Sequence, residues 1–159
     1  MNRINIIICL CFFLSISCKN DKTSKEAHNF KDMKNYDNPV IYFEIPVTDM
    51  ERAIKFYKAV FSFQFEKEVI DNNEMALFPF SDEGKGISGA LAKGEIYKPT
   101  RNGVVIYFKT KDIQKTLEVA VANGGKILYP KTSNGDLGFV AEFEDSEGNR
   151  IALHQSITK

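Results

Sequence analysis

The chain contains 159 residues, and its 21 basic residues are matched by 21 acidic ones, so the formal net charge is zero. A neutral chain with no basic stripe lacks the electrostatic surface that nucleic-acid binding requires, and that function class is excluded. Hydrophobic residues make up 43% of the chain, which is enough for one domain with a real core.

Residues 1–18 have the pattern of an export signal. Arg3 precedes an apolar run over residues 6–16, which is too short to span a bilayer, since that needs about 20 apolar residues. The ending Leu-Ser-Ile-Ser-Cys18 is similar to the lipobox of bacterial lipoproteins, in which the cysteine is lipidated and becomes the first mature residue. We expect a lipid anchor at Cys18 that holds the protein in the cell envelope, facing the periplasm or the cell exterior. Simple secretion, with cleavage after small residues, is the alternative.

The three cysteines, Cys9, Cys11 and Cys18, all lie in this leader, so the rest of the chain has no thiol for a disulfide, a nucleophile or a metal site. Residues 19–38 follow with alternating lysines and acids and few apolar residues. Such a composition predicts a flexible tether. The domain itself is expected over residues 39–156.

The first half of this domain predicts one strand, one helix and three further strands. Residues 40–47 alternate as a strand, and Asp49 then caps a helix over 50–61. The apolar residues of this helix recur at spacings of three and four, which predicts that one face packs on a sheet. This apolar stripe comprises Met50, Ala53, Ile54, Tyr57, Val60 and Phe61. Short β-like runs at 63–70, 75–80 and 87–93 follow.

The second half repeats this order. Residues 104–109 read as a strand and residues 113–121 as a helix that ends at Asn123-Gly124-Gly125. Three more β-like runs follow, at 126–129, 139–144 and 150–155, with a hairpin turn at 145–149. The predicted class is therefore α+β, with two βαβββ modules that form one curled, cleft-bearing mixed sheet and helices on the outside.

Three motifs in the right order resemble the vicinal oxygen chelate superfamily, which includes glyoxalase I, bleomycin and fosfomycin resistance proteins and extradiol dioxygenases. They are EIPVTDMERAIKFYKAVF at 44–61, ANGGKIL at 122–128 and FEDSEGNRIAL at 143–153. One departure is Ser62, where many relatives have a glycine after the helix. The internal repeat itself implies one domain with pseudo-two-fold symmetry, and the functional site is expected in the cleft where its two halves meet.

The resemblance also implies a divalent metal, held by His, Glu or Gln side chains from the first and last strand of each module. The matching positions here are Tyr42, Ala90, Val105 and Ala152, and three of these have no donor side chain. Because His28 lies in the tether, His154 is the only histidine of the domain. Glu44 and Glu142 are conceivable substitute ligands, although strand alternation places Glu142 opposite Phe143. We therefore expect no metal and no other cofactor.

Strand alternation nevertheless indicates a ligand-binding wall. If the predicted faces line the concave side, Tyr42, Glu44, Tyr107 and His154 share a mixed aromatic and hydrogen-bonding surface suited to a small polar or planar ligand. In the purely structural alternative, the tyrosines fill the mouth of the sheet and Glu44 pairs with Lys109 across it.

Three functions follow from this reading. The first is an exported, lipid-anchored protein that binds a small molecule in the cleft without a metal, as bleomycin resistance proteins do. The second is a metal-dependent lyase or isomerase resembling lactoylglutathione lyase, with Glu44 as ligand or base and His154 as its partner. The third is a structural or interaction module of the envelope. The sequence leaves open whether two chains pair as a homodimer.

Overall fold

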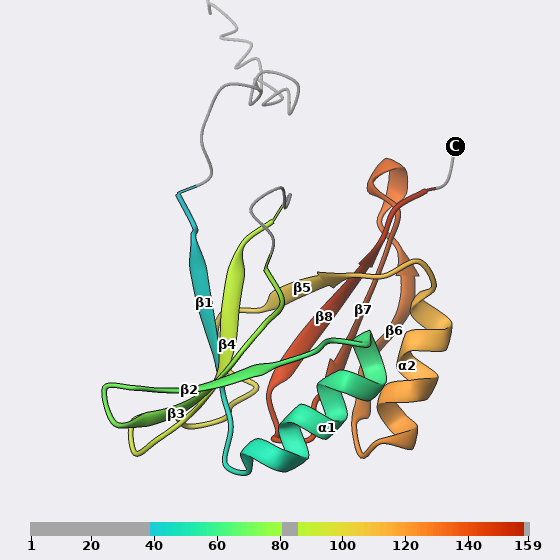
Figure 1. Ribbon diagram of the computed structural model, residues 1–159. Helices are drawn as coiled ribbons and strands as arrows, with labels where there is room; N and C mark the ends of the chain where they lie inside the picture. Colours follow the sequence, from blue (N-terminus) through green and yellow to red (C-terminus); the bar gives the residue numbers. More distant parts are fainter. Residues whose placement is uncertain (1–38, 81–85, 158–159) are drawn as a thin grey trace, which may run out of the picture. The chain divides into compact units, whose positions relative to one another are not determined.

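The computed structural model describes residues 39–80 and 86–157, and the predicted leader and tether lie outside these residues. The described residues form two modules of identical order (Figure 1). The described part of the chain holds no helix with the length and hydropathy of a membrane span. The first module contains β1 (Tyr42–Pro46), α1 (Met50–Phe61), β2 (Glu66–Ile70), β3 (Asn73–Leu77) and β4 (Ser88–Lys93); the second contains β5 (Ile106–Lys109), α2 (Ile113–Ala122), β6 (Lys126–Ser133), the 3₁₀ turn η2 (Gly135–Leu137), β7 (Phe139–Glu144) and β8 (Arg150–Gln155).

The α+β class and the βαβββ repeat are confirmed. Each module forms its own four-stranded mixed sheet, with the strand orders β1-β4-β3-β2 and β5-β8-β7-β6. In both sheets the first and last strands of the module pair in parallel, and the remaining pairs are antiparallel. Several strands differ in extent from the sequence prediction. β2 begins at Glu66, because the phenylalanines before it pack into the core, and β3 covers Asn73–Leu77 instead of 75–80. β5 begins at Ile106, and β6 continues to Ser133.

Helix α1 begins and ends at residues suited to those positions. The Asp49 side chain accepts a hydrogen bond from the backbone N–H of Arg52 at 3.0 Å, as expected of an N-cap. Ser62 closes the helix in the left-handed region, at φ 61° and ψ 25°, where glycine is the unstrained residue. The buried face includes Phe56, which the predicted stripe omitted, because α1 also packs against α2 and the second sheet.

The two glycines that end α2 have different roles. Gly124 has a φ of +100° and open space around its Cα, so its role is conformational. Gly125 is needed for space, because an added Cβ would lie 2.7 Å from the backbone oxygen of Glu144. This contact lets the start of β6 pack closely beside β7, which accounts for the Asn-Gly-Gly motif.

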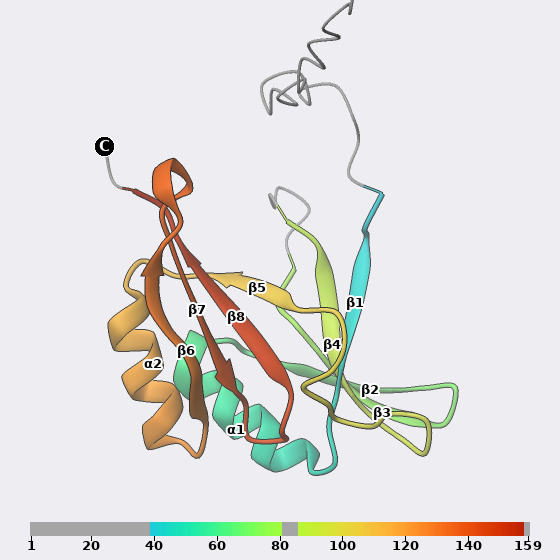
Figure 2. The ribbon, with the colours of Figure 1, turned by 180° about the vertical axis from the view of Figure 1, so that it is seen from behind.

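Both helices lie on the same side of the two sheets (Figures 1 and 2). One hydrophobic cluster fills the space between helices and sheets, and it contains buried residues of both modules. Phe43 of β1 and Phe108 of β5 meet within it, with ring centroids 6.2 Å apart. Among the described residues, no helix covers the opposite face of either sheet.

The turn between β7 and β8 ties the modules together through two carboxylates. The Glu147 side chain is inaccessible to solvent and accepts hydrogen bonds from the backbone N–H groups of Thr48 and Asp49, both at 3.0 Å. It also accepts from the Thr48 hydroxyl and from Nε and Nη2 of Arg52, all at 2.8 Å. These bonds fix the start of α1 against the second module.

Asp145 makes the second link. Its Oδ2 accepts a hydrogen bond from the hydroxyl of the fully buried Tyr57 at 2.8 Å, and its Oδ1 accepts from two backbone N–H groups of the same turn. Burial raises the pKa of Asp145, while its hydrogen bonds with Asn149 and Tyr57 oppose that rise. The Asp-Ser-Glu-Gly-Asn segment is therefore more than a hairpin turn, because it joins the two halves of the domain.

Candidate ligand-binding trough

The helix-free face of the first sheet has a floor of small and apolar side chains. Met75, Ala90 and Ala92 are buried there, with Leu77 and Tyr97 packed against them. Glu44 stands on the same face, since it pairs in register with Ala90. Alternation in the strands thus separates this surface from the main core on the other side of the sheet.

The connecting segment between the modules, residues 94–105, contacts one end of this face. The Tyr97 hydroxyl donates a hydrogen bond to Oε2 of Glu44 at 2.8 Å, and this bond to Glu44 raises the pKa of Tyr97. Further along, the backbone N–H of Thr100 donates to Oδ1 of Asn149 at 3.0 Å, and the backbone N–H of Arg150 donates to the Thr100 oxygen. The segment is therefore fixed to both modules.

A cavity of about 200 Å³ lies where β1, this segment and the start of β8 meet. Its wall includes Glu44 and Pro46 from the first module, Val104 from the connecting segment, and Asn149 and Arg150 from the second module. Residues distant in sequence thus form one site at the junction that the internal repeat predicted.

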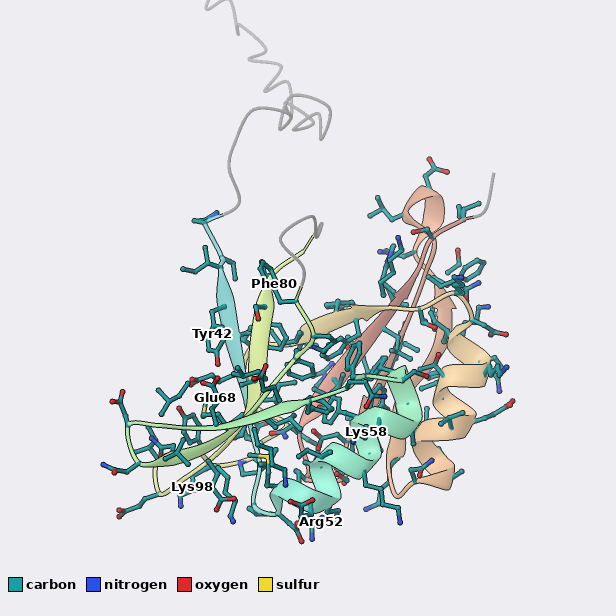
Figure 3. All side chains as sticks on the ribbon, viewed as in Figure 1. Tyr42, Arg52, Lys58, Glu68, Phe80 and Lys98 are labelled. Atoms are coloured by element: carbon teal, nitrogen blue, oxygen red, sulfur yellow. The ribbon has the colours of Figure 1, made fainter. Side chains whose placement is uncertain are left out.

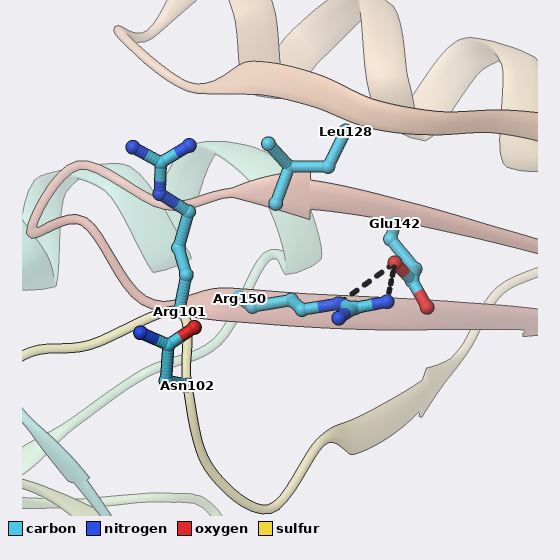
Figure 4. A pocket seen from close by; sticks show the side chains of 5 residues that line it. All are labelled: Arg101, Asn102, Leu128, Glu142 and Arg150. Atoms are coloured by element: carbon cyan, nitrogen blue, oxygen red, sulfur yellow. Dashed lines mark hydrogen bonds and ion pairs between the residues drawn. The ribbon is translucent and has the colours of Figure 1, made fainter.

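A second cavity, of about 550 Å³, lies over the helix-free face of the second sheet (Figure 4). Its lining residues are Arg101, Asn102, Leu128, Glu142 and Arg150. Arg150 belongs to both cavities, so they adjoin at this side chain. We call the two cavities together the trough.

Two acidic residues hold the arginines of the trough. Glu142 Oε2 accepts from Nε of Arg150 at 2.8 Å and lies 2.5 Å from its Nη2. Nε of Arg101 lies 2.9 Å from Oε2 of Glu144, and Lys126 Nζ lies 3.6 Å from the other oxygen of that carboxylate. Both acidic side chains are largely buried, at 15% and 14% exposure, and Glu142 lines the cavity.

Of the four residues predicted to line the cleft, Glu44 lies in the trough. Tyr42 lies two residues earlier on the same face of β1, over the first sheet with Glu68 and away from Arg52 on α1 (Figure 3). Burial raises the pKa of Tyr42, with added contributions from the charges of Glu44 and Glu68. Tyr107 is 55% exposed and pairs in register with Ala152.

His154 has a different partner. Its Nε2 lies 2.7 Å from the backbone oxygen of Leu137, so the ring is engaged with the turn η2 between β6 and β7. Lys109 pairs in register with His154, on the neighbouring strand. The structure thus brings Glu44 into the trough and gives His154 a contact with a hairpin of its own module.

Sequence reasoning missed the arginines of the trough. Arg150 lies on the same face of β8 as Ala152 and His154, so strand alternation in the sequence is sufficient to place it on this face. The same alternation places Glu142 on the opposite face of β7 from the buried Phe143, and that opposite face is the one that lines the cavity. Arg101 lies in the connecting segment, where no periodic pattern exists, and no local signal could have found it.

The four family positions do not fit a divalent metal. Ala90 and Ala152 are fully buried and have no donor atoms, and Ala90 pairs with Glu44, whose Oε2 accepts from Tyr97. In the described residues no three His, Cys, Asp or Glu side chains are grouped so that they could hold a metal ion.

Comparison with known proteins defines the class that this fold and site belong to. The model of the Glyoxalase/Bleomycin resistance protein/Dioxygenase superfamily matches residues 40–153. A glyoxylase-like domain-containing protein of Didymella fabae is 32% identical over 114 residues, which are 69% of this chain and 88% of that protein. The chain belongs to this superfamily, as its three motifs indicated.

Solved structures share the fold at lower identity. Glyoxalase I from Zea mays superposes with a TM-score of 0.56 and 22% identity over 74% of this chain, which spans only 46% of the maize chain. TnmS3, an antibiotic binding protein from Streptomyces sp. CB03234, superposes with a TM-score of 0.56 and 22% identity, covering 76% of this chain and 98% of its own.

Proposed function

We propose that this domain binds a small organic molecule in the trough and does so without a metal ion. The observation that carries the proposal is Arg150, which lines both cavities and so joins the junction of the modules to the second sheet. The larger cavity has the volume of a typical small-molecule site, about 300 to 1,000 Å³. Side chains with opposite charges and an apolar contact, Leu128, are available to orient a ligand there.

The relatives support binding over metal chemistry. TnmS3 has the same fold, matches over nearly its whole length and is an antibiotic binding protein. Glyoxalase I also has the fold, but the family's metal positions are occupied here by side chains that include two buried alanines. Two adjoining cavities and metal positions without donor side chains favour a binding protein over a metal enzyme.

A variant that fills the trough tests this function. Val104 is 89% exposed and lines the smaller cavity, so Val104→Trp should occupy that space without disturbing the core. The full chain, purified in mild detergent, is screened by thermal shift against a library of organic molecules. We expect binders that raise the melting temperature of the parent chain, and we expect Val104→Trp to abolish that rise.

The matched control is Val121→Trp on α2, which is 48% exposed and lies on the helix side of the sheet. It should leave the ligand-induced shift unchanged. A library in which no compound shifts the parent chain would overturn the proposal. Binders whose effect survives both Val104→Trp and Leu128→Trp, which fills the larger cavity, would also overturn it, because these would bind outside the trough.

We further propose that the domain works in the cell envelope, anchored through lipid on Cys18. The support is the leader pattern of residues 1–18, which lie outside the described residues. In a bacterial host, the full chain should fractionate with membranes, and Cys18→Ser should move it to the soluble fraction. Equal partition of both proteins into the soluble fraction would instead support simple secretion.

A further inference from the structure

We propose that the larger cavity of the trough recognises an organic anion, whose carboxylate or phosphate group binds Arg101, with Arg150 adding a second positive charge to the same cavity, while its apolar part lies against Leu128. This inference rests on the proposed binding function and names the class of ligand. The two arginines come from different elements, the connecting segment and β8, and line the same cavity (Figure 4).

Both guanidinium groups keep hydrogen-bond donors in reserve. A guanidinium has five N–H donors. Nε and Nη2 of Arg150 share one oxygen, Oε2 of Glu142, so Nη1 has no partner among the described residues. Nε of Arg101 forms an ion pair with Oε2 of Glu144, which accepts no hydrogen bond from the described residues, and both terminal nitrogens of Arg101 likewise have no hydrogen-bond partner within the described part of the chain. The cavity therefore offers two terminal nitrogens of Arg101 to an anionic group, and one of Arg150 elsewhere on its wall.

The glutamates position the arginines without neutralising the cavity. Arg101 and Arg150 supply two positive charges to the lining of the larger cavity, against the single negative charge of Glu142. The arginine side chains are 58% and 42% exposed, whereas the acidic side chains behind them are largely buried. A ligand that enters from solvent therefore meets guanidinium groups first. Because these groups are already held in place, less side-chain entropy is lost on binding.

The shape of the cavity selects an organic anion over an inorganic one. Its volume of about 550 Å³ is far larger than a phosphate or a carboxylate group alone would fill. Leu128 supplies apolar surface beside Arg101 (Figure 4). An anionic group on a planar or aliphatic body uses both features, since guanidinium groups bind carboxylate and phosphate with parallel hydrogen bonds.

Three probes that share one apolar body test the anion. They are 2-naphthoate, 2-naphthyl phosphate and the neutral amide 2-naphthamide, titrated into the full chain in mild detergent and followed by ligand fluorescence. We expect at least one of the two anions to bind about tenfold or more tightly than the amide, as charge-assisted hydrogen bonds imply. The preferred anion identifies carboxylate or phosphate as the natural group.

Arg101→Gln should reduce that preference to about twofold, because it removes the charge and two terminal donors while leaving a polar side chain. Arg101→Lys keeps the positive charge but loses the planar guanidinium group. Its preference for the anion should lie between those of Arg101→Gln and the parent chain. The control is Lys115→Gln, on the exposed face of α2, which should keep the full preference. Melting temperatures of all variants verify that each is folded.

Failure of this inference can be told from failure of the binding function. If the amide binds as tightly as the anions, and Val104→Trp abolishes its binding, the trough binds ligands but the anion assignment is wrong. An anion preference that survives Arg101→Gln would also overturn the assignment. If none of the three probes binds and the library yields no binder, both proposals fail.

Discussion

Glu147 is the residue on which the junction of the modules depends most directly. Burial by itself raises the pKa of this carboxyl, but hydrogen bonds from Arg52, Asp49 and Thr48 outweigh burial and lower it to about 2. Two of the donors are backbone N–H groups at the start of α1, where the positive end of the helix also favours an anion. The charged form of Glu147 is therefore part of the folded structure.

Glu147→Gln should destabilise the domain by about 1 to 3 kcal/mol at pH 7, because an amide replaces a carboxylate that accepts charged and backbone donors. The folded pKa lies below the ordinary value of 4.5, so the stabilisation is complete above pH 4.5 and is lost as the pH falls toward 2. Urea unfolding of both proteins at pH 7, 4 and 3 should show the difference between them shrinking over that window.

Other groups titrate in the same range but do not obscure this comparison. Asp145 has a raised pKa, which favours the folded state at low pH and gives the opposite slope, but it is present in both proteins. Their difference thus isolates Glu147. A difference in unfolding free energy that stays constant from pH 7 to pH 3 would show that the charge of Glu147 contributes nothing.

The sequence could not show these roles at the residue scale. It predicted residues 145–149 as a hairpin turn, which is a local property of Asp, Ser, Gly and Asn. The partners of Glu147 lie 95 to 99 positions away, and no spacing in the sequence relates them. The same applies to Arg101, whose position in the trough depends on how the connecting segment is fixed to Asn149.

At the scale of the elements, the sequence predicts where each helix begins and ends, because the residues that determine these points lie close together in the chain. The cap at Asp49, the apolar spacing of α1 and the Asn-Gly-Gly end of α2 all act within a few residues, and each was predicted. Phe56 was missed because its burial depends on α2 and the second sheet, which a single helical stripe cannot report. The extent of β6 was missed because its partner β7 is what sustains it.

The end of α1 offers a substitution that should stabilise the domain. Ser62 has a left-handed backbone, with φ at 61°, and its N–H donates to the Lys58 oxygen at 2.9 Å. Ser62→Gly removes the steric cost of a Cβ in this conformation, and we expect a gain of roughly 0.5 to 1 kcal/mol. Chemical denaturation of the two proteins measures it.

The matched control is Lys58→Gly, inside the same helix, where the added backbone freedom should destabilise by about 1 kcal/mol. Opposite signs for the two glycine substitutions would show that backbone conformation, and not loss of a side chain, decides the effect. If Ser62→Gly were destabilising too, the left-handed cap would not be a source of strain.

On the scale of the whole molecule, the two modules share one core. Buried residues of β1, α1, β3 and β4 belong to the same cluster as those of α2, β7 and β8. The helices also contact each other, and the turn at Asp145 and Glu147 bonds to α1. The internal repeat that the sequence revealed therefore describes how the chain is built, whereas the unit of stability is the pair of modules.

Leu117→Ala in α2 tests this shared stability. Leu117 is 1% exposed in the common core, so its truncation should cost about 2 to 5 kcal/mol. Because the modules are joined, the substitution should lower the opening free energy measured by hydrogen exchange equally in both modules. The slowest amides of β3 and β4 should therefore lose as much protection as those of β7 and β8. Loss of protection confined to the second module would show that the modules unfold separately. In that case the trough, whose walls come from both modules, would lose its second-sheet side while the first sheet stayed folded, and ligand binding would report only the stability of the weaker half.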